Sequence, residues 1–182
     1  MLRRRRKGQT SLEILALLLI ALAITAVSAA VYNLLYMNLP ISVEPAKIRF
    51  VSGDDSTVAG AQIGVNGTYV SFNSVSGWPN ALRVYTDAVR IKNFDPSSRT
   101  INLRLDSYNG DTSAVEFIRI KLFDGDTQMG NTIEAGTGNT STGDLSMSAG
   151  AEWRVQLEIR WKDGVLSTYS VSLQLSLVVP GE

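Results

Sequence analysis

Carboxylates are the side chains in this sequence with the greatest capacity for chemistry. The chain has no histidine and no cysteine, which removes the usual general base, thiolate metal ligands and disulfides. Asp54 and Asp55 are adjacent in a turn-like segment, and Asp124 and Asp126 flank Gly125, as in part of a calcium loop. Neither pair has the spaced oxygen ligands closed by a glutamate that an EF-hand needs. The sequence therefore predicts solvated turn carboxylates and no metal site.

Catalysis by a pair of carboxylates is no better supported. Asp106 is near Asp111 in the chain, and Asp124 is near Asp126, so each pair is a candidate acid and base. Such catalysis requires an environment that raises the pKa of one carboxyl above that of the other. The polar, Gly- and Asn-containing surroundings offer no such difference. We expect no catalytic residue, no cofactor and no enzymatic activity.

Two sequons for N-glycosylation begin at Asn66 and Asn139, and they matter only if this part of the chain is exported. Asn139 lies in a segment rich in Gly, Thr and Ser, whereas Asn66 precedes Gly67 in a predicted tight turn. Asn139 is therefore predicted to be the better acceptor.

The three tryptophans fall into two groups. Trp153 and Trp161 share one face of an alternating segment, which predicts burial in a core. Trp78, followed by Pro79, lies outside any alternating run. Its indole could contact a sugar or a neighbouring subunit, and the sequence does not choose between them.

The N-terminal segment has the charge and hydropathy pattern of a membrane-inserted helix. Five of the 17 basic residues lie at positions 3–7, and no charged residue occurs from Ile14 to Val43. A helix over residues 9–38 would be roughly 45 Å long, enough to span a ~30 Å hydrocarbon core and project beyond it. The basic run keeps the N-terminus inside the cell and sends the rest outside. Beyond position 7, 12 basic residues face 17 acidic ones, which argues against a nucleic-acid partner.

Three kinds of signal share this layout. A conventional signal peptide would be cut near Ala29 or Ala30, but its apolar core would be shorter, ~7 to 15 residues. An uncleaved signal anchor explains the length and leaves Glu13 unexplained, because an isolated carboxylate in an apolar run is costly.

The third kind accounts for Glu13. Gly8 followed by Gln9, Ser11, Glu13 and Leu17 resembles the class III signal peptide of archaeal type IV pilin-like proteins, with their Q-x-S-x-E-x-x-x-L motif. The resemblance covers the first ~35 residues. It implies that a prepilin peptidase cuts between Gly8 and Gln9. It also implies that a membrane assembly platform and its ATPase bundle the apolar helices, after they leave membrane lipid, into a helical homo-oligomeric filament. Glu13 would then pair with the new amino group of a neighbouring Gln9 or cap the helix N-terminus.

Beyond Pro45 the pattern changes to alternation. Strands are predicted at 48–52, 62–65, 68–72, 82–92, 100–106 and 115–123. Residues 153–161 and 169–179 are predicted to form a long antiparallel hairpin around Asp163 and Gly164. Residues 130–150 are predicted to form an exposed loop.

The predicted fold class is α+β: a long N-terminal hydrophobic α-helix followed by an all-β, immunoglobulin-like sandwich. The expected parts are a basic leader at 1–8, a transmembrane and filament-core helix at 9–38, a linker at 39–47 and an extracellular domain at 48–182. The expected function is that of a structural pilin, an adhesive glycoprotein of a cell-surface filament whose precursor lies in the cytoplasmic membrane. Alternatives are a minor or membrane-retained protein presenting a surface binding domain, an archaellin of the motility filament, or a membrane-anchored extracellular enzyme.

Overall fold

The structure is a computed structural model, and it describes residues 13–21, 45–73, 75–136 and 138–180. The chain divides into two units, Met1–Val43 and Glu44–Glu182. Within the first unit, the described residues 13–21 form a helix. We call residues 45–180 of the second unit the β domain.

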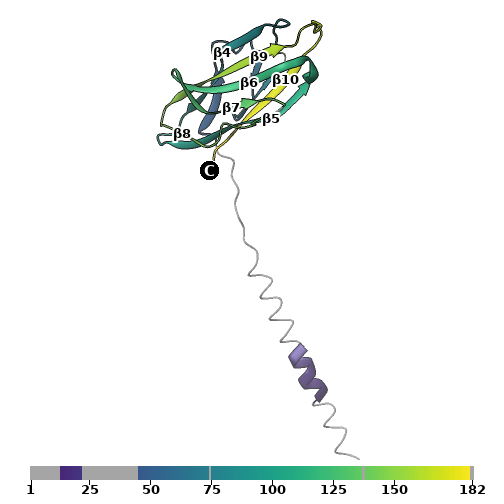
Figure 1. Cartoon of the computed structure of the whole chain (residues 1–182). Coiled ribbons are helices and arrows are strands. Elements are labelled where there is room, and N and C mark those ends of the chain that lie inside the picture. The colour runs from purple at the N-terminus through teal and green to yellow at the C-terminus, as the bar shows by residue number, and fades with distance from the viewer. Residues whose placement is uncertain (1–12, 22–44, 74, 137, 181–182) are drawn as a thin grey trace, which may run out of the picture. The chain divides into compact units, whose positions relative to one another are not determined.

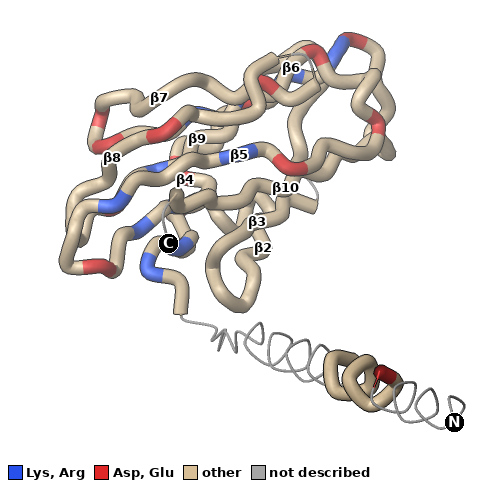
Figure 2. The backbone as a smooth tube through the Cα atoms, turned by 90° about the horizontal axis from the view of Figure 1, so that it is seen from below, with Lys and Arg blue, Asp and Glu red and all other residues tan. Residues whose placement is uncertain are grey.

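Ten strands make up the β domain (Figure 1). They are β1 (Ile48–Ser52), β2 (Ala61–Ile63), β3 (Tyr69–Phe72), β4 (Leu82–Asn93), β5 (Arg99–Gly110), β6 (Val115–Asp124), β7 (Thr127–Glu134), β8 (Leu145–Met147), β9 (Glu152–Trp161) and β10 (Val171–Val178), with a 3₁₀ turn at Thr112–Ala114. One sheet has the order β1-β4-β9-β6-β7, and the other has the order β2-β3-β10-β5-β8. Within each sheet, the paired strands are antiparallel. Acidic and basic residues are both spread over these strands (Figure 2).

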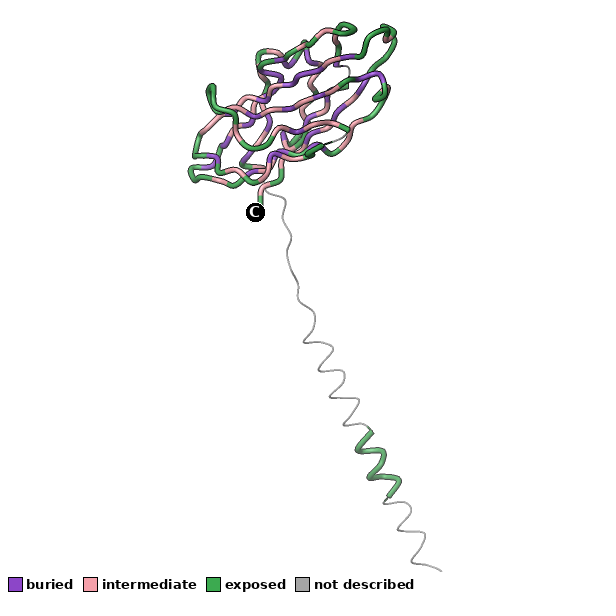
Figure 3. Tube along the Cα trace, viewed as in Figure 1, coloured by how far each residue is buried: buried purple, intermediate pink, exposed green. Residues whose placement is uncertain are grey.

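The buried faces of the two sheets share one hydrophobic core. In β9 the alternating residues Trp153, Val155, Leu157, Ile159 and Trp161 are all buried, as the sequence pattern predicts. Leu173 and Leu175 of β10 are buried in the same core from the other sheet. Figure 3 shows buried residues recurring along the strands, whereas the helix at 13–21 is exposed along its length.

The predicted fold class is wrong. The described residues are mostly β, and the helix among them covers residues 13–21, about 14 Å at 1.5 Å per residue. In the described part of the chain, no helix has both the length and the apolar character to cross a membrane, so the predicted transmembrane helix is also corrected. The prediction took the length of the uncharged run as the length of a helix. Hydropathy, however, indicates only that a segment needs burial and does not fix its backbone conformation. Residues 9–12 and 22–38 of the predicted helix lie outside the described residues.

The predicted β9–β10 hairpin is wrong as well. β9 pairs with β4 and β6, and β10 pairs with β3 and β5 in the other sheet. Asp163 and Gly164 do form a turn, with the Gly164 N–H donating to Asp163 Oδ1 at 2.9 Å. However, the connection continues to residue 170 and crosses between sheets. Because both strands have one apolar face, placing them in opposite sheets lets both faces cover the same core.

The predicted loop at 130–150 contains parts of two strands, β7 and β8. In β7 only Ile133 is fully buried, and Gly130 has a positive φ of 65°. β7 has a single fully buried residue and β8 is only three residues long, which explains why the sequence pattern does not reveal them.

Candidate functional site

The N-terminal motif is described only in part. Gly8, Gln9 and Ser11 lie outside the described residues, whereas Glu13 begins the described helix and Leu17 follows one turn later. Every residue of this helix is exposed. Its six large aliphatic side chains are 57–66% exposed, and they are Ile14, Leu15, Leu17, Leu18, Leu19 and Ile20. Ile14, Leu17 and Leu18 share one face of the helix, and Leu15, Leu19 and Ile20 extend the aliphatic surface around its other sides. Such a surface requires lipid or other protein to cover it.

The two sequons lie at exposed positions with different surroundings. Asn66 is exposed in the turn between β2 and β3, and no hydrogen bond engages its side chain within the described part of the chain. Asn139 is also exposed, but its Nδ2 donates to the backbone oxygens of Ser141 at 2.5 Å and Thr132 at 3.4 Å. Glycosylation requires Nδ2 as the nucleophile, so the geometry favours Asn66, whereas sequence composition favours Asn139.

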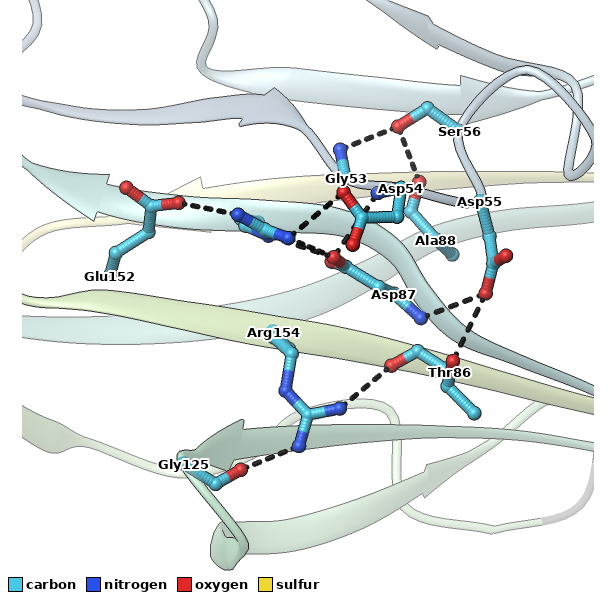
Figure 4. A network of polar contacts seen from close by, with 11 residues as sticks. Gly53, Asp54, Asp55, Ser56, Thr86, Asp87, Ala88, Gly125, Glu152 and Arg154 are labelled. Atoms are coloured by element: carbon cyan, nitrogen blue, oxygen red, sulfur yellow. Dashed lines mark hydrogen bonds and ion pairs between the residues drawn. The ribbon is translucent and has the colours of Figure 1, made fainter.

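A network of charged residues surrounds the buried Asp87, in the middle of β4 (Figure 4). Asp87 Oδ2 accepts hydrogen bonds from Arg90 Nε at 2.8 Å and from the Asp54 N–H at 3.1 Å. Arg90 also contacts Asp54 Oδ1 and Glu152 Oε1, each at 3.2 Å. We call Asp54, Asp87, Arg90 and Glu152 the Asp87 network.

The electrostatics of the Asp87 network point to structure and not to catalysis. Burial acts to raise the pKa of the Asp87 carboxyl, but the hydrogen bond and charge of Arg90, with the Asp54 amide, outweigh it and hold the pKa below its usual value. Hydrogen bonds from Lys92 and Arg90 likewise lower the pKa of Glu152. Both carboxyls stay ionised at neutral pH, so neither is poised to exchange a proton. The network holds the segment after β1 against β4.

Four of the other carboxylates considered from the sequence have protein partners. Asp55 Oδ2 accepts from Thr86 Oγ1 at 3.2 Å, and Asp106 Oδ1 accepts from Arg104 Nε at 2.8 Å. Asp111 Oδ2 accepts from the Ser170 N–H at 2.9 Å, and Asp126 lies 3.6 Å from Arg154. Asp124 is exposed at the end of β6. The described residues contain no group of three acidic side chains arranged to hold a metal ion.

A cleft of 510 Å³ lies at the end of the β domain where β4 and β10 begin and β9 ends. We call it the aromatic cleft, and its walls are residues 75–79, Trp161 and residues 165–170. Trp78 is 63% exposed, Tyr169 is 41% exposed and Trp161 is buried. A volume of this size falls within the ~300–1,000 Å³ typical of small-molecule sites.

Backbone pairing fixes one wall of the aromatic cleft. Pro79 forms an isolated parallel bridge with Trp161, and the Asn80 N–H donates to the Trp161 carbonyl at 3.0 Å. On the other side of Trp78, Tyr85 Oη donates to the Ser76 carbonyl at 3.0 Å. The segment carrying Trp78 is therefore held at both of its ends.

The opposite wall is anchored through Ser170. Its N–H donates to Asp111 Oδ2 at 2.9 Å, and its carbonyl accepts from the Asp111 N–H at 2.8 Å. The Tyr169 N–H donates to the Leu166 carbonyl at 3.1 Å, closing a turn within the wall. The sequence singled out Trp78 but not its partners, because Trp161 and Tyr169 reach the cleft only through sheet pairing and the crossing between sheets.

Comparison with known proteins gives little further information. No protein-family model matches the chain, and no curated protein matches it. A solved structure of the secreted serine protease VesC from Vibrio cholerae is similar with 15% identity and a TM-score of 0.31. The match covers 62% of this chain and 21% of the protease, so this chain spans about a fifth of the length of that protein. At this TM-score the similarity carries no argument about fold or activity.

Proposed function

We propose that this protein is a structural subunit of a type IV pilus-like surface filament, processed between Gly8 and Gln9. The observation that supports it best is the aliphatic surface around the helix at 13–21, where six large side chains are at least 57% exposed. In a filament, copies of this segment bury that surface against one another. Each ~100 Å² of apolar area exposed to water costs about 2.5 kcal/mol, so these six side chains must be covered by other copies once the segment leaves lipid.

In this proposal, Glu13 determines how neighbouring subunits align in the filament. Cleavage after Gly8 creates an amino group on Gln9, four residues from Glu13 in the sequence. The Glu13 carboxylate of one subunit pairs with that amino group on a neighbour, which offsets the cost of taking both charges out of water. A prepilin peptidase, an assembly platform and its ATPase are the partners this function requires. The work of the filament at the cell surface is mechanical and adhesive, without a catalytic role.

Two measurements on the native protein test this proposal. The mature chain should begin at Gln9 by mass spectrometry, and purified surface filaments should contain it. A start near Ala30 or an intact Met1 refutes the processing step.

A pair of matched substitutions tests the assembly step. Leu17→Asn should abolish or strongly reduce filament yield, because it places an amide on the surface that copies must bury. Val58→Asn makes the same type of change at a 59% exposed position of the β domain and should leave yield unchanged. Glu13→Ala should still be processed yet assemble poorly. Normal filaments from Leu17→Asn and Glu13→Ala would overturn the proposed role of this segment.

A further inference from the structure

The aromatic cleft has the chemical character of a ligand site. Among the described residues, twelve line the cleft, and none of them carries a charge. Its walls combine the rings of Trp78, Tyr169 and Trp161 with exposed hydroxyls, including those of Ser167 and Thr168. An uncharged ligand that has both an apolar face and hydroxyl groups matches this combination.

Trp78 is held in place although it is exposed. The guanidinium of Arg83 lies 5.1 Å from the centre of the Trp78 ring and 4.7 Å from that of Tyr85. Arg83 also donates from its Nη1 to Ser76 Oγ at 2.9 Å. Arg83 therefore links Trp78 to Tyr85 of β4 and to Ser76 in the cleft wall. Because these contacts already hold the Trp78 side chain, ligand binding costs little side-chain entropy.

Trp161 forms another part of the cleft wall. It is only 3% exposed, and its buried indole Nε1 has no hydrogen-bond partner among the residues that the structure describes. A buried N–H donor left unpaired costs free energy, so such a group requires an explanation. Trp161 lines the cleft, but its nitrogen is buried beneath the surface, so the residue contributes ring surface to the wall.

Gly77 packs closely against this indole. A Cβ added at Gly77 would lie 2.8 Å from Trp161 Cδ1 and 2.9 Å from Nε1, closer than real Cβ contacts allow. Glycine at position 77 thus allows this wall of the cleft to approach the Trp161 indole without displacing it.

We propose that the aromatic cleft binds a neutral carbohydrate. The C–H groups of one sugar face stack on the exposed Trp78 indole, whose π face is electron-rich. The sugar hydroxyls exchange hydrogen bonds with the serine and threonine wall. A second copy of this chain fits less well, because a stable protein interface uses roughly 20–30 residues a side and the cleft has twelve.

Tryptophan fluorescence of the full chain provides the test. Of the three tryptophans, Trp78 is exposed, whereas Trp153 and Trp161 are at most 3% exposed, so quenching by acrylamide reports mainly on Trp78. The probes are hexasaccharides of maltose, cellulose, chitin and mannan type, titrated to about 10 mM to cover weak sites. Because the helix at 13–21 exposes aliphatic side chains, the chain is kept in a detergent without a sugar headgroup.

We expect at least one probe to protect Trp78 from acrylamide with a saturable curve. Isothermal titration should then give roughly tenfold weaker binding for Trp78→Ala and for Gly77→Ala. Phe94→Ala is the matched control, because Phe94 is another exposed aromatic in contact with an arginine, outside the cleft. It should bind as the unmodified chain does.

Three outcomes would overturn the proposal. They are failure of all four probes to bind, binding that Trp78→Ala leaves unchanged, and protection of Trp78 that rises with protein concentration alone. The last result would identify the cleft as a contact between copies. None of them affects the cleavage and filament-yield measurements, so this proposal and the filament proposal can fail separately.

Discussion

Substitution of Asp87 by asparagine should destabilise the β domain measurably. Asp87 is 4% exposed and receives hydrogen bonds from Arg90 and the Asp54 amide. Asparagine keeps the size and one acceptor oxygen but removes the negative charge. Arg90 then keeps only Asp54 and Glu152 as anionic partners.

The size of the effect follows from the burial of the two partners. Removing one member of a fully buried ion pair costs about 3–5 kcal/mol. The Arg90 side chain is 29% exposed and keeps two carboxylates, so we expect about half of this, ~2 kcal/mol. For a chain of this length, ~2 kcal/mol lowers Tm by about 4–8 °C.

The sign of the pH dependence follows from the lowered pKa of Asp87. A carboxyl with a lower pKa in the folded state than in the unfolded state stabilises the fold above its unfolded pKa of about 3.9. That contribution disappears as pH falls through the folded pKa. The difference in Tm between the two proteins should therefore be full at pH 7 and shrink below about pH 4.

Thermal unfolding of both proteins, followed by circular dichroism from pH 2 to 7, is the assay. Glu116→Gln is the control, because it breaks an exposed pair with Arg160, and such pairs contribute about 0–1 kcal/mol. Equal Tm values at pH 7, or a difference that persists undiminished at pH 2, would refute the argument that the Asp87 charge stabilises the domain.

Three further predictions concern other positions of the β domain. Gly53→Ala should lower stability by about 1–3 kcal/mol in urea unfolding, because the new Cβ would overlap the backbone oxygen of Asp87. Asn93→Ala should cost about 2–3 kcal/mol in the same assay, because Asn93 is 1% exposed and its Nδ2 faces three backbone carbonyls. If the native protein is glycosylated, Asn66→Gln should remove the sugar mass and Asn139→Gln should not; the reverse result would show that the hydrogen bonds of Asn139 do not restrain it.

Prediction from sequence succeeded where one strand face is buried and the other is not. The alternation in β9 identifies both the strand and its buried tryptophans, and Ile48–Ser52 is a strand with the predicted bounds. Alternation says nothing about which strands pair, and the β9–β10 hairpin was wrong for that reason. β7 was missed because it has only one fully buried residue, whereas β1, also at a sheet edge, has alternating buried residues.

The candidate site likewise combines features that the sequence predicts with features that it does not. The exposure of Trp78 follows from its sequence surroundings, since no alternating run includes it. The unpaired Nε1 of Trp161 could not be predicted, because the alternation of β9 indicates only that the residue is buried. Gly77, next to Trp78, was the available signal: a glycine beside an exposed aromatic residue suggests that something must approach closely.

The pairing of β1 with β4 has a mechanical consequence. Ile48 pairs with Asn93 and Ser52 with Val89, so the chain enters β1 at the end of β4 that lies opposite the aromatic cleft. Tension between a ligand in the cleft and the segment before residue 48 pulls the two strands lengthwise in opposite directions. The hydrogen bonds of the β1–β4 ladder are then sheared together and not opened one at a time. Force applied through a ligand in the cleft thus acts along the strands, which is the direction in which an antiparallel pair of strands resists separation best.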